Sequence, residues 1–299
     1  MLDELAHAGP EHLDAAFITG FDRKQGYPSP QEDIAAFEAH GIGKASVVVD
    51  LGAGTGQFAL PAARHFGRVI AVDVSRAMLN AMRSKADAIS APLRPLEYVQ
   101  GGFLSYCPAT PVDAVYTRNA LHQMPDFWKA IALTRIAAML KPGGVLRLRD
   151  LVYDFQPHEA EEVFAGWLTS AAADPADGYT AADYAEHIRT EHSTFRWLLE
   201  PMLAAAGFEI TDVTYERRLY GAYTCVLAGG RLGGTTSPGA VGEVGPGRLH
   251  QPRIRRHPPH ALRLLSRQDR TGGGHGRADA AALAASGSQA ALQRGDSRR

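Results

Sequence analysis

Short runs of branched apolar residues alternate, between residues 45 and 228, with longer segments whose apolar residues recur at helical spacing. Continuous apolar runs are typical of buried parallel strands, whereas apolar residues three or four positions apart, as in residues 127–140, indicate a helix. Strands that alternate with helices predict an α/β fold with a mostly parallel sheet. The first predicted strands are residues 47–49, 68–73, 96–100, 111–117 and 145–150.

The segment 155–200 is longer than a single helical connection between two strands requires. Its apolar spacing predicts helices at residues 159–168 and 180–191, and we expect them to form a helical cap over the site. Two further apolar runs, 208–215 and 221–227, predict a pair of strands that completes the sheet.

A glycine-rich loop follows the first predicted strand, because Gly52, Gly54 and Gly56 alternate with other residues shortly after Asp50. Glycine adopts positive φ readily and has no Cβ, so the backbone of such a loop can approach a ligand closely. A helical pattern begins near Ala59, which places the loop at a helix N-terminus with free amide groups. We therefore expect a ligand to bind at this loop.

The glycine spacing separates three kinds of ligand. A dinucleotide-binding loop has glycine at its first, third and sixth positions, and Gln57 stands at the sixth position here. A phosphate-binding loop ends in Gly-Lys-Ser/Thr, which is absent from this loop. Asp50, two residues before a Gly-x-Gly-x-Gly run, instead resembles the first motif of the class I S-adenosylmethionine (SAM)-dependent methyltransferases.

A second motif of the same family follows the second predicted strand. Asp73 ends that strand, where a carboxylate can accept hydrogen bonds from both hydroxyls of a ribose. With Ser75 and Met78 after it, the segment resembles the family's second motif, and the Lys-Pro-Gly-Gly turn at residues 141–144 is frequent in the family. The resemblance, to the small-molecule branch (type 11/25), covers residues 45–228.

The resemblance implies a Rossmann-like, doubly wound sheet of seven strands in the order 3-2-1-4-5-7-6, with a final antiparallel hairpin and SAM as cofactor. Many family members have an aspartate at the position of Gly102, which accepts a hydrogen bond from adenine. We expect backbone groups and stacking by Phe103 to replace it. The expected cofactor-binding residues are Asp50, Gly52, Ala53, Gly54, Gly56, Asp73, Val74, Met78, Gly102, Phe103 and Asn119.

Polar residues that follow the fourth predicted strand lie at the carboxyl ends of the strands, where open α/β sheets bind ligands. The run from Asn119 to Asp126 resembles the fourth motif of small-molecule methyltransferases. We expect His122 to be the catalytic residue, as a general base or an orienting group, and a structural histidine is the alternative. The expected acceptor-binding residues are Tyr27, Asp150, Tyr153 and His192.

The two cysteines, Cys107 and Cys225, are too few and too far apart for a zinc site or a disulfide framework, and no metal is expected. The chain has no run of 18 apolar residues, which predicts no membrane span. Acidic residues near the N-terminus are unlike a secretion signal, so we expect a cytoplasmic protein.

Charge is distributed unevenly along the 299 residues, although the formal net charge is −1. Residues 229–299 contain twelve arginines, no lysine, four acids and no aromatic residue, so their net charge is about +8 and that of the remainder about −9. Such a tail cannot bury enough apolar surface to fold, and we expect it to be disordered, with an out-of-frame translation or a basic nucleic-acid arm as alternatives. The acidic remainder argues against nucleic acid as the acceptor.

The predicted organisation is an N-terminal helical lid (1–44), a methyltransferase domain (45–228) that includes the cap (155–200), and the tail (229–299). The predicted function is SAM-dependent methyl transfer to a small-molecule acceptor. Two alternatives stay open: a SAM-binding module without catalysis, and an NAD-dependent oxidoreductase, which Gln57 disfavours. The sequence leaves the oligomeric state open.

Overall fold

The computed structural model describes residues 2–26, 29–90 and 93–229. The chain divides into two units, residues 1–259 and 260–299, and every described residue belongs to the first. Tyr27 and the arginine-rich tail beyond Gly229 therefore lie outside the described residues.

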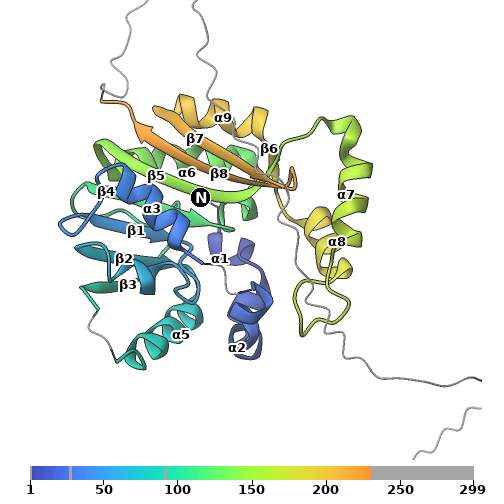
Figure 1. Cartoon of the computed structure of the whole chain (residues 1–299), viewed down its shortest axis with the longest axis horizontal. Helices are drawn as coiled ribbons and strands as arrows, with labels where there is room; N and C mark the ends of the chain where they lie inside the picture. The colour runs from blue at the N-terminus through green and yellow to red at the C-terminus, as the bar shows by residue number, and fades with distance from the viewer. Residues whose placement is uncertain (1, 27–28, 91–92, 230–299) are drawn as a thin grey trace, which may run out of the picture. The chain divides into compact units, whose positions relative to one another are not determined.

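A single mixed sheet forms the centre of the fold, in the order β3-β2-β1-β4-β5-β8-β7 (Figure 1). β8 is antiparallel to both of its neighbours, and the other pairs of this path are parallel. This confirms the predicted order, since the two-residue β6 lies off the path and pairs only with β5. The strands are β1 (Val47–Leu51), β2 (Arg68–Asp73), β3 (Leu96–Gln100), β4 (Val112–Arg118), β5 (Leu140–Tyr153), β6 (Thr194–Phe195), β7 (Phe208–Glu216) and β8 (Tyr220–Leu227).

Helices cover both faces of the sheet. Successive strand residues point to opposite faces, so a run of apolar residues makes both faces apolar. Val48 packs in a core with α3 (Gln31–Ala39), α4 (Ala59–Ala62) and α5 (Arg76–Asp87). Its neighbour Val49 packs in the core on the other face, with α6 (Asp126–Met139) and α9 (Arg196–Ala205). The continuous apolar runs that predicted buried strands therefore supply both cores.

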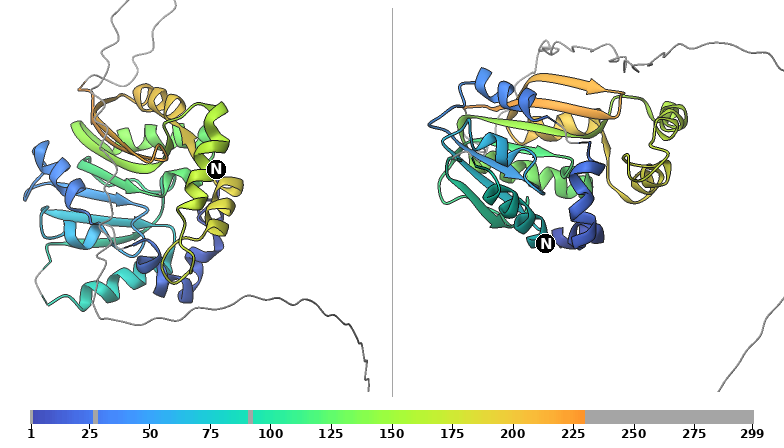
Figure 2. Two further views of the ribbon diagram at one scale, coloured as in Figure 1. Left: turned by 45° about the vertical axis from the view of Figure 1, so that its right-hand side comes forward. Right: turned by 60° about the horizontal axis from the view of Figure 1, so that its bottom comes forward.

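Two helical segments lie beyond the ends of the strands. The N-terminal segment contains α1 (Glu4–His7), the short helix η1 (Pro10–Leu13) and α2 (Ala15–Lys24). The cap contains η3 (Pro157–Glu159), α7 (Ala160–Thr169) and α8 (Ala181–Thr190). Figures 1 and 2 show α7 and α8 apart from the helices that flank the sheet.

The cap has a small apolar core of its own, around Trp167, Tyr153 and Phe155. α8 begins with a capping box in which Thr180 and Asp183 exchange side chain and backbone hydrogen bonds. Both cap helices lie within about two residues of their predicted bounds. Among the described residues, the helices are all too short or too polar to cross a bilayer.

The Lys-Pro-Gly-Gly segment differs from its predicted role as a separate turn. α6 ends at Met139, and β5 begins at Leu140, so this segment is the irregular start of β5. Gly143 has a φ of +77°, and the register between β4 and β5 shifts at this place. A Cβ at Gly144 would lie 2.8 Å from the carbonyl oxygen of Lys141, so the chain approaches itself too closely for another residue.

Candidate active site

The glycine loop after β1 is bonded to the end of β2. Gly52, Gly54 and Gly56 all have positive φ, at +74°, +52° and +87°. The amides of Gly52 and Ala53 both donate to the Val72 carbonyl oxygen, at 2.9 and 3.0 Å. These two amides are therefore occupied, and the expectation that amides at the start of α4 face a ligand stays a prediction.

Close packing between two loops explains why Gly52 is a glycine. A Cβ at this position would lie 2.5 Å from the Cβ of Ala120, in the loop that follows β4. The adjacent Asn119 has a φ of +47°, which asparagine tolerates better than most residues, and its amide donates to the Arg149 carbonyl oxygen at 2.9 Å. Asn119 thus lies next to the glycine loop, where the sequence placed it.

Two buried carboxylates stand at the ends of β1 and β2. Asp73 accepts hydrogen bonds from the amides of Ser75 and Gly54, both at 2.8 Å. Burial raises the pKa of Asp73, and these two amides oppose that effect. Burial, together with the charge of Asp73, raises the pKa of Asp50 well above its usual range. Asp50 Oδ2 is buried and has no hydrogen-bond partner among the described residues.

α2 packs over the glycine loop. Phe21 Cε1 lies 3.7 Å from the position that a Cβ on Gly54 would occupy. Asp22 accepts hydrogen bonds from Thr55 Oγ1 and from Gln57 Nε2, the latter at 3.1 Å, and pairs with Lys85 of α5. Burial raises the pKa of Asp22, but these partners outweigh burial and lower it.

α1 places a carboxylate beside Gly102. Glu4 accepts hydrogen bonds from the amide of Leu104 at 3.1 Å and from the Ser105 hydroxyl at 3.0 Å. A Cβ at Gly102 would overlap this carboxylate. The missing aspartate side chain thus leaves room for an acid from another part of the chain. Phe103 is buried in the core, so its expected stacking on adenine stays a prediction.

Two further expected cofactor contacts lie in the same region. Met78, on α5, is 1% exposed, and its amide donates to the Ser75 hydroxyl at the start of that helix. Val74 is half-buried, and its side chain lies next to Gly102. Met78 therefore packs as a core residue here, and contact with a cofactor stays a prediction for both side chains.

Asp150 holds the loop after β4 in place. Its Oδ2 accepts hydrogen bonds from the amides of Ala120, Leu121 and His122, at 3.3, 2.8 and 3.2 Å. Its Oδ1 accepts from the Leu151 amide at 2.7 Å and is bonded to Nδ1 of His122. Both oxygens of Asp150 are occupied in this way, and Asp150 therefore orients His122. Its direct contact with the methyl acceptor stays a prediction.

His122 lies in the short helix η2 (Leu121–Gln123) and contacts carboxylates on both ring nitrogens. Its Nε2 lies 2.7 Å from Oε2 of Glu191, at the end of α8. Burial alone would lower the pKa of His122, but Asp150 and Glu191 raise it to about 9. Both carboxylates favour the protonated ring, so a role as general base requires that the ring first lose this proton.

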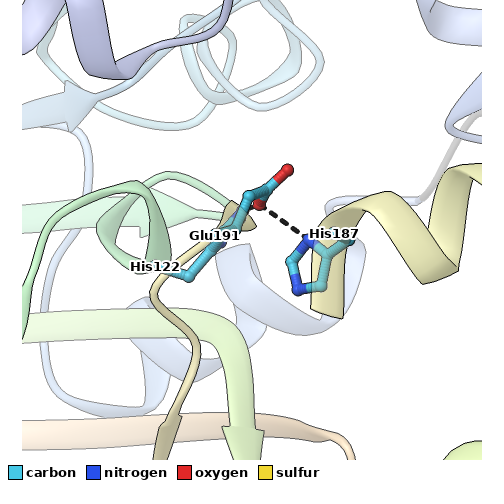
Figure 3. Close-up of side chains that lie close together, drawn as sticks. All are labelled: His122, His187 and Glu191. Atoms are coloured by element: carbon cyan, nitrogen blue, oxygen red, sulfur yellow. Dashed lines mark ion pairs between the residues drawn. The ribbon is translucent and has the colours of Figure 1, made fainter. Parts of the chain in front are cut away.

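Glu191 also contacts a second histidine. Its Oε2 lies 2.7 Å from Nδ1 of His187, one helical turn earlier in the chain, and Figure 3 shows the three side chains close together. The pKa of Glu191 is lowered: burial raises it, and the two histidines more than offset that effect. His187 and Glu191 were not predicted as site residues, although their four-residue spacing puts them on one face of a helix.

The remaining expected acceptor residues lie around this cluster. Tyr153 is buried against Phe155 and Phe164 in the cap core, where burial raises its pKa. His192 is exposed, and its amide donates to the His122 carbonyl oxygen at 2.9 Å. His192 thus lies beside His122 and Tyr153 packs in the cap core, and contact of either side chain with a methyl acceptor stays a prediction.

Comparison with known proteins identifies the family. The methyltransferase domain family matches residues 48–144. A carboxy-S-adenosyl-L-methionine synthase from Pseudomonas fluorescens is 32% identical over 200 residues, which span 61% of this chain and 77% of that protein. The chain belongs to the class I SAM-dependent methyltransferase family.

Two further proteins are similar to this methyltransferase. A trans-aconitate 2-methyltransferase from an Azoarcus species is 32% identical over 107 residues, 35% of this chain and 39% of that protein. The crystal structure of magnesium protoporphyrin IX methyltransferase from Synechocystis PCC 6803 superposes with a TM-score of 0.53 at 14% identity, covering 76% of this chain and 99% of that one. The latter likeness supports the fold.

Family membership confirms three predictions for this methyltransferase: the fold class, SAM as cofactor, and methyl transfer as the class of reaction. The residues around the glycine loop fit such a ligand. Asp73 is held rigidly by two amides and keeps acceptor capacity for hydroxyl groups, and Asp50 Oδ2 is a buried oxygen without a partner. A buried orphan acceptor is costly unless a ligand or water donates to it.

Proposed function

We propose that this methyltransferase modifies a small-molecule acceptor, which binds between the loop after β4 and the cap. The contact between the N-terminal segment and the cap carries this proposal. Lys24 Nζ lies 2.8 Å from Asp183 Oδ1, and Gln25 Nε2 donates to the Tyr179 hydroxyl at 2.6 Å. Two helical segments that meet above the strand ends leave space for a small molecule more readily than for a folded protein or a nucleic acid.

The residues assigned to the cofactor have distinct parts in this proposal. Asp73 binds the ribose hydroxyls, the loop from Gly52 to Gly56 surrounds the methionine end, and Glu4 and Gly102 border the adenine end. When bound, SAM supplies a methyl carbon that an acceptor lone pair attacks as the C–S bond breaks, leaving S-adenosylhomocysteine and a proton. The protein's contribution is to align the acceptor and exclude water, which accounts for much of the rate enhancement in such reactions.

We assign the lid to the first part of the predicted segment 1–44, namely α1, η1 and α2, which contact both the glycine loop and the cap, because α3 packs in the core beside the sheet. The Asp22–Lys85 pair attaches α2 to the body of the domain, and the Lys24–Asp183 pair attaches it to α8. Both pairs are partly exposed, so each contributes little to stability, about 0–1 kcal/mol. A segment held by weak contacts of this kind can open for ligand exchange without unfolding the sheet.

Calorimetric titration with S-adenosylhomocysteine tests the cofactor site. Replacing Asp73 with alanine should weaken binding at least about tenfold, because a charge-assisted hydrogen bond contributes about 1.5–3 kcal/mol. Asp87→Ala, which changes an exposed acid at the end of α5, the helix that follows β2, is the matched control and should bind like the wild type. Equal affinity of Asp73→Ala and the wild type would contradict the ribose assignment.

The class of acceptor is tested with methyl-labelled SAM and a cell extract separated into a small-metabolite fraction, a protein fraction and an RNA fraction. Labelled methyl groups should appear in the small-metabolite fraction. Label confined to protein or RNA would refute the proposed acceptor class while leaving methyl transfer intact.

A second candidate function follows from the carboxy-S-adenosyl-L-methionine synthase that is similar to 61% of this chain. The name of that relative indicates a product derived from SAM itself. Mass spectrometry of the adenosyl products separates the two: S-adenosylhomocysteine supports methyl transfer, and a carboxylated SAM supports the second candidate.

A further inference from the structure

Three potential metal-ligand atoms from two parts of the chain converge beside the proposed acceptor site. His122 Nε2 comes from the loop after β4, and His187 Nδ1 and a Glu191 oxygen come from α8 and its end. All three atoms lie within 4.8 Å of one another, and Glu191 Oε2 is 2.7 Å from each nitrogen. Two imidazoles and one carboxylate are a common ligand set for zinc and other divalent transition metals.

The opposite nitrogen of each imidazole is already bonded, which fixes how the ring faces the cluster. His122 Nδ1 is bonded to Asp150, and His187 Nε2 lies 2.8 Å from the Ser193 hydroxyl. Histidines that bind metals nearly always make such a second hydrogen bond, often to a carboxylate. The outer contacts that a metal site requires are therefore present in this protein.

The carboxylate oxygen at the centre is shared by the two imidazoles. Glu191 Oε2 is buried and lies 2.7 Å from a nitrogen of each ring, although neither contact has the geometry of an ordinary hydrogen bond. A divalent cation between these three atoms takes the oxygen and both nitrogens as ligands, in place of the direct contacts between them. Lys129, the buried cation nearby, bonds instead to Asp126 at 2.7 Å and to the His192 carbonyl oxygen.

We propose that His122, His187 and Glu191 bind one divalent transition-metal ion. Ligand atoms about 2.1 Å from an ion, at ordinary coordination angles, lie about 3.0–3.4 Å apart, so the observed 2.7 Å contacts need to widen by about half an ångström. Three protein ligands leave at least one position open, as in catalytic rather than structural sites. This proposal departs from the prediction made from the sequence, in which no metal was expected.

The ion links the cap to the body of the domain and faces the proposed acceptor site. An oxygen or nitrogen of the methyl acceptor binds at the open position of the ion. The positive charge makes the proton of that group easier to lose to solvent, and the lone pair that remains attacks the methyl carbon. This role in catalysis rests on the proposed function. Binding of the ion does not, and it is measured without cofactor or acceptor.

The experiment adds Co²⁺ to the full chain after treatment with a chelator and follows the visible absorption of the bound ion, with metal analysis after gel filtration. The wild type should retain one Co²⁺ per chain. His187→Ala and Glu191→Gln should each weaken binding at least about 100-fold, and Ser193→Ala about tenfold, because outer-shell changes already cost 10–100-fold. His158→Ala and Glu186→Ala, exposed cap residues outside the cluster, are the matched controls and should bind normally.

Three results would overturn the metal site: no uptake of Co²⁺ by the wild type, equal uptake by His187→Ala, or loss of uptake in the control variants as well. Circular dichroism and thermal melts show whether each variant is folded. Titration with S-adenosylhomocysteine on the same samples separates the two proposals. A wild type that binds S-adenosylhomocysteine but no Co²⁺ contradicts the metal site alone, whereas the reverse contradicts the cofactor site alone.

Discussion

Replacing Asp150 with alanine should destabilise the protein by about 3–5 kcal/mol, the usual cost of removing one partner of a buried ion pair. The side chain of Asp150 is 3% exposed and accepts hydrogen bonds from four backbone amides and the His122 imidazole. Each buried donor that loses its partner costs about 1–3 kcal/mol. Water entering the space left by alanine satisfies some of these donors, so their costs do not add in full.

Urea denaturation in the presence of EDTA measures the change in the free energy of unfolding without a contribution from bound ions. Asp150→Ala should lower the midpoint with an unchanged dependence on urea concentration, since the surface exposed on unfolding stays nearly the same. Asp87→Ala, which is exposed, should change stability by less than about 0.5 kcal/mol.

A double-mutant cycle separates the imidazole contact from the backbone contacts of Asp150. His122→Ala combined with Asp150→Ala should show a coupling energy of about 0.5–3 kcal/mol. A loss of less than about 1 kcal/mol for Asp150→Ala alone would contradict the prediction, because the loop after β4 would then be held by something other than this carboxylate.

Two further predictions concern the glycine loop and the lid. Gly52→Ala should destabilise the fold by more than about 1 kcal/mol in urea denaturation, because the new Cβ would meet Ala120 and the φ is positive, whereas Gly43→Ala, which faces open space, should be nearly neutral. The lid contact of Asp22 with Lys85 should weaken in acid, because the pKa of Asp22 is lower in the folded protein than in the unfolded chain. The ionised carboxylate therefore stabilises the folded lid at any pH above the ordinary carboxyl pKa of about 4, and this stabilisation is lost as the pH falls through the lowered pKa. Hydrogen exchange of the α2 amides at pH 7 and at about pH 3 checks this, and equal protection relative to the α6 amides would contradict it.

Much of the fold could be predicted from local sequence. Val47 to Val49 are apolar on both faces because helices cover both sides of β1, and the same holds for the other parallel strands. The order of the strands came from the family resemblance and not from the apolar runs. The start of β5 was placed too late: Leu140 already pairs with Val112 of β4 and the ladder resumes at Val145, so residues 141–144 form an irregular stretch within β5 and not a turn before it.

The candidate site was less predictable because its parts come from distant segments. His122 and His187 are 65 positions apart in the chain, and apolar spacing indicates that 180–191 is a helix without indicating where that helix docks. Glu4 could not be assigned to Gly102 for the same reason. The place of Asp73 beside the glycine loop was predictable, by contrast, because that loop and both strand ends lie close together in the sequence, while its contact with a ligand stays a prediction.

The contacts around the proposed acceptor site differ in strength, and this difference indicates where a ligand gains access. Lys24 and Asp183, which join the lid to the cap, are 22% and 31% exposed, so water competes for their charges. His122 and Asp150 are almost fully buried, and separating charges there costs several kcal/mol. Because the weaker contact opens more often, we infer that cofactor and acceptor exchange where the lid meets the cap, while the loop after β4 stays fixed.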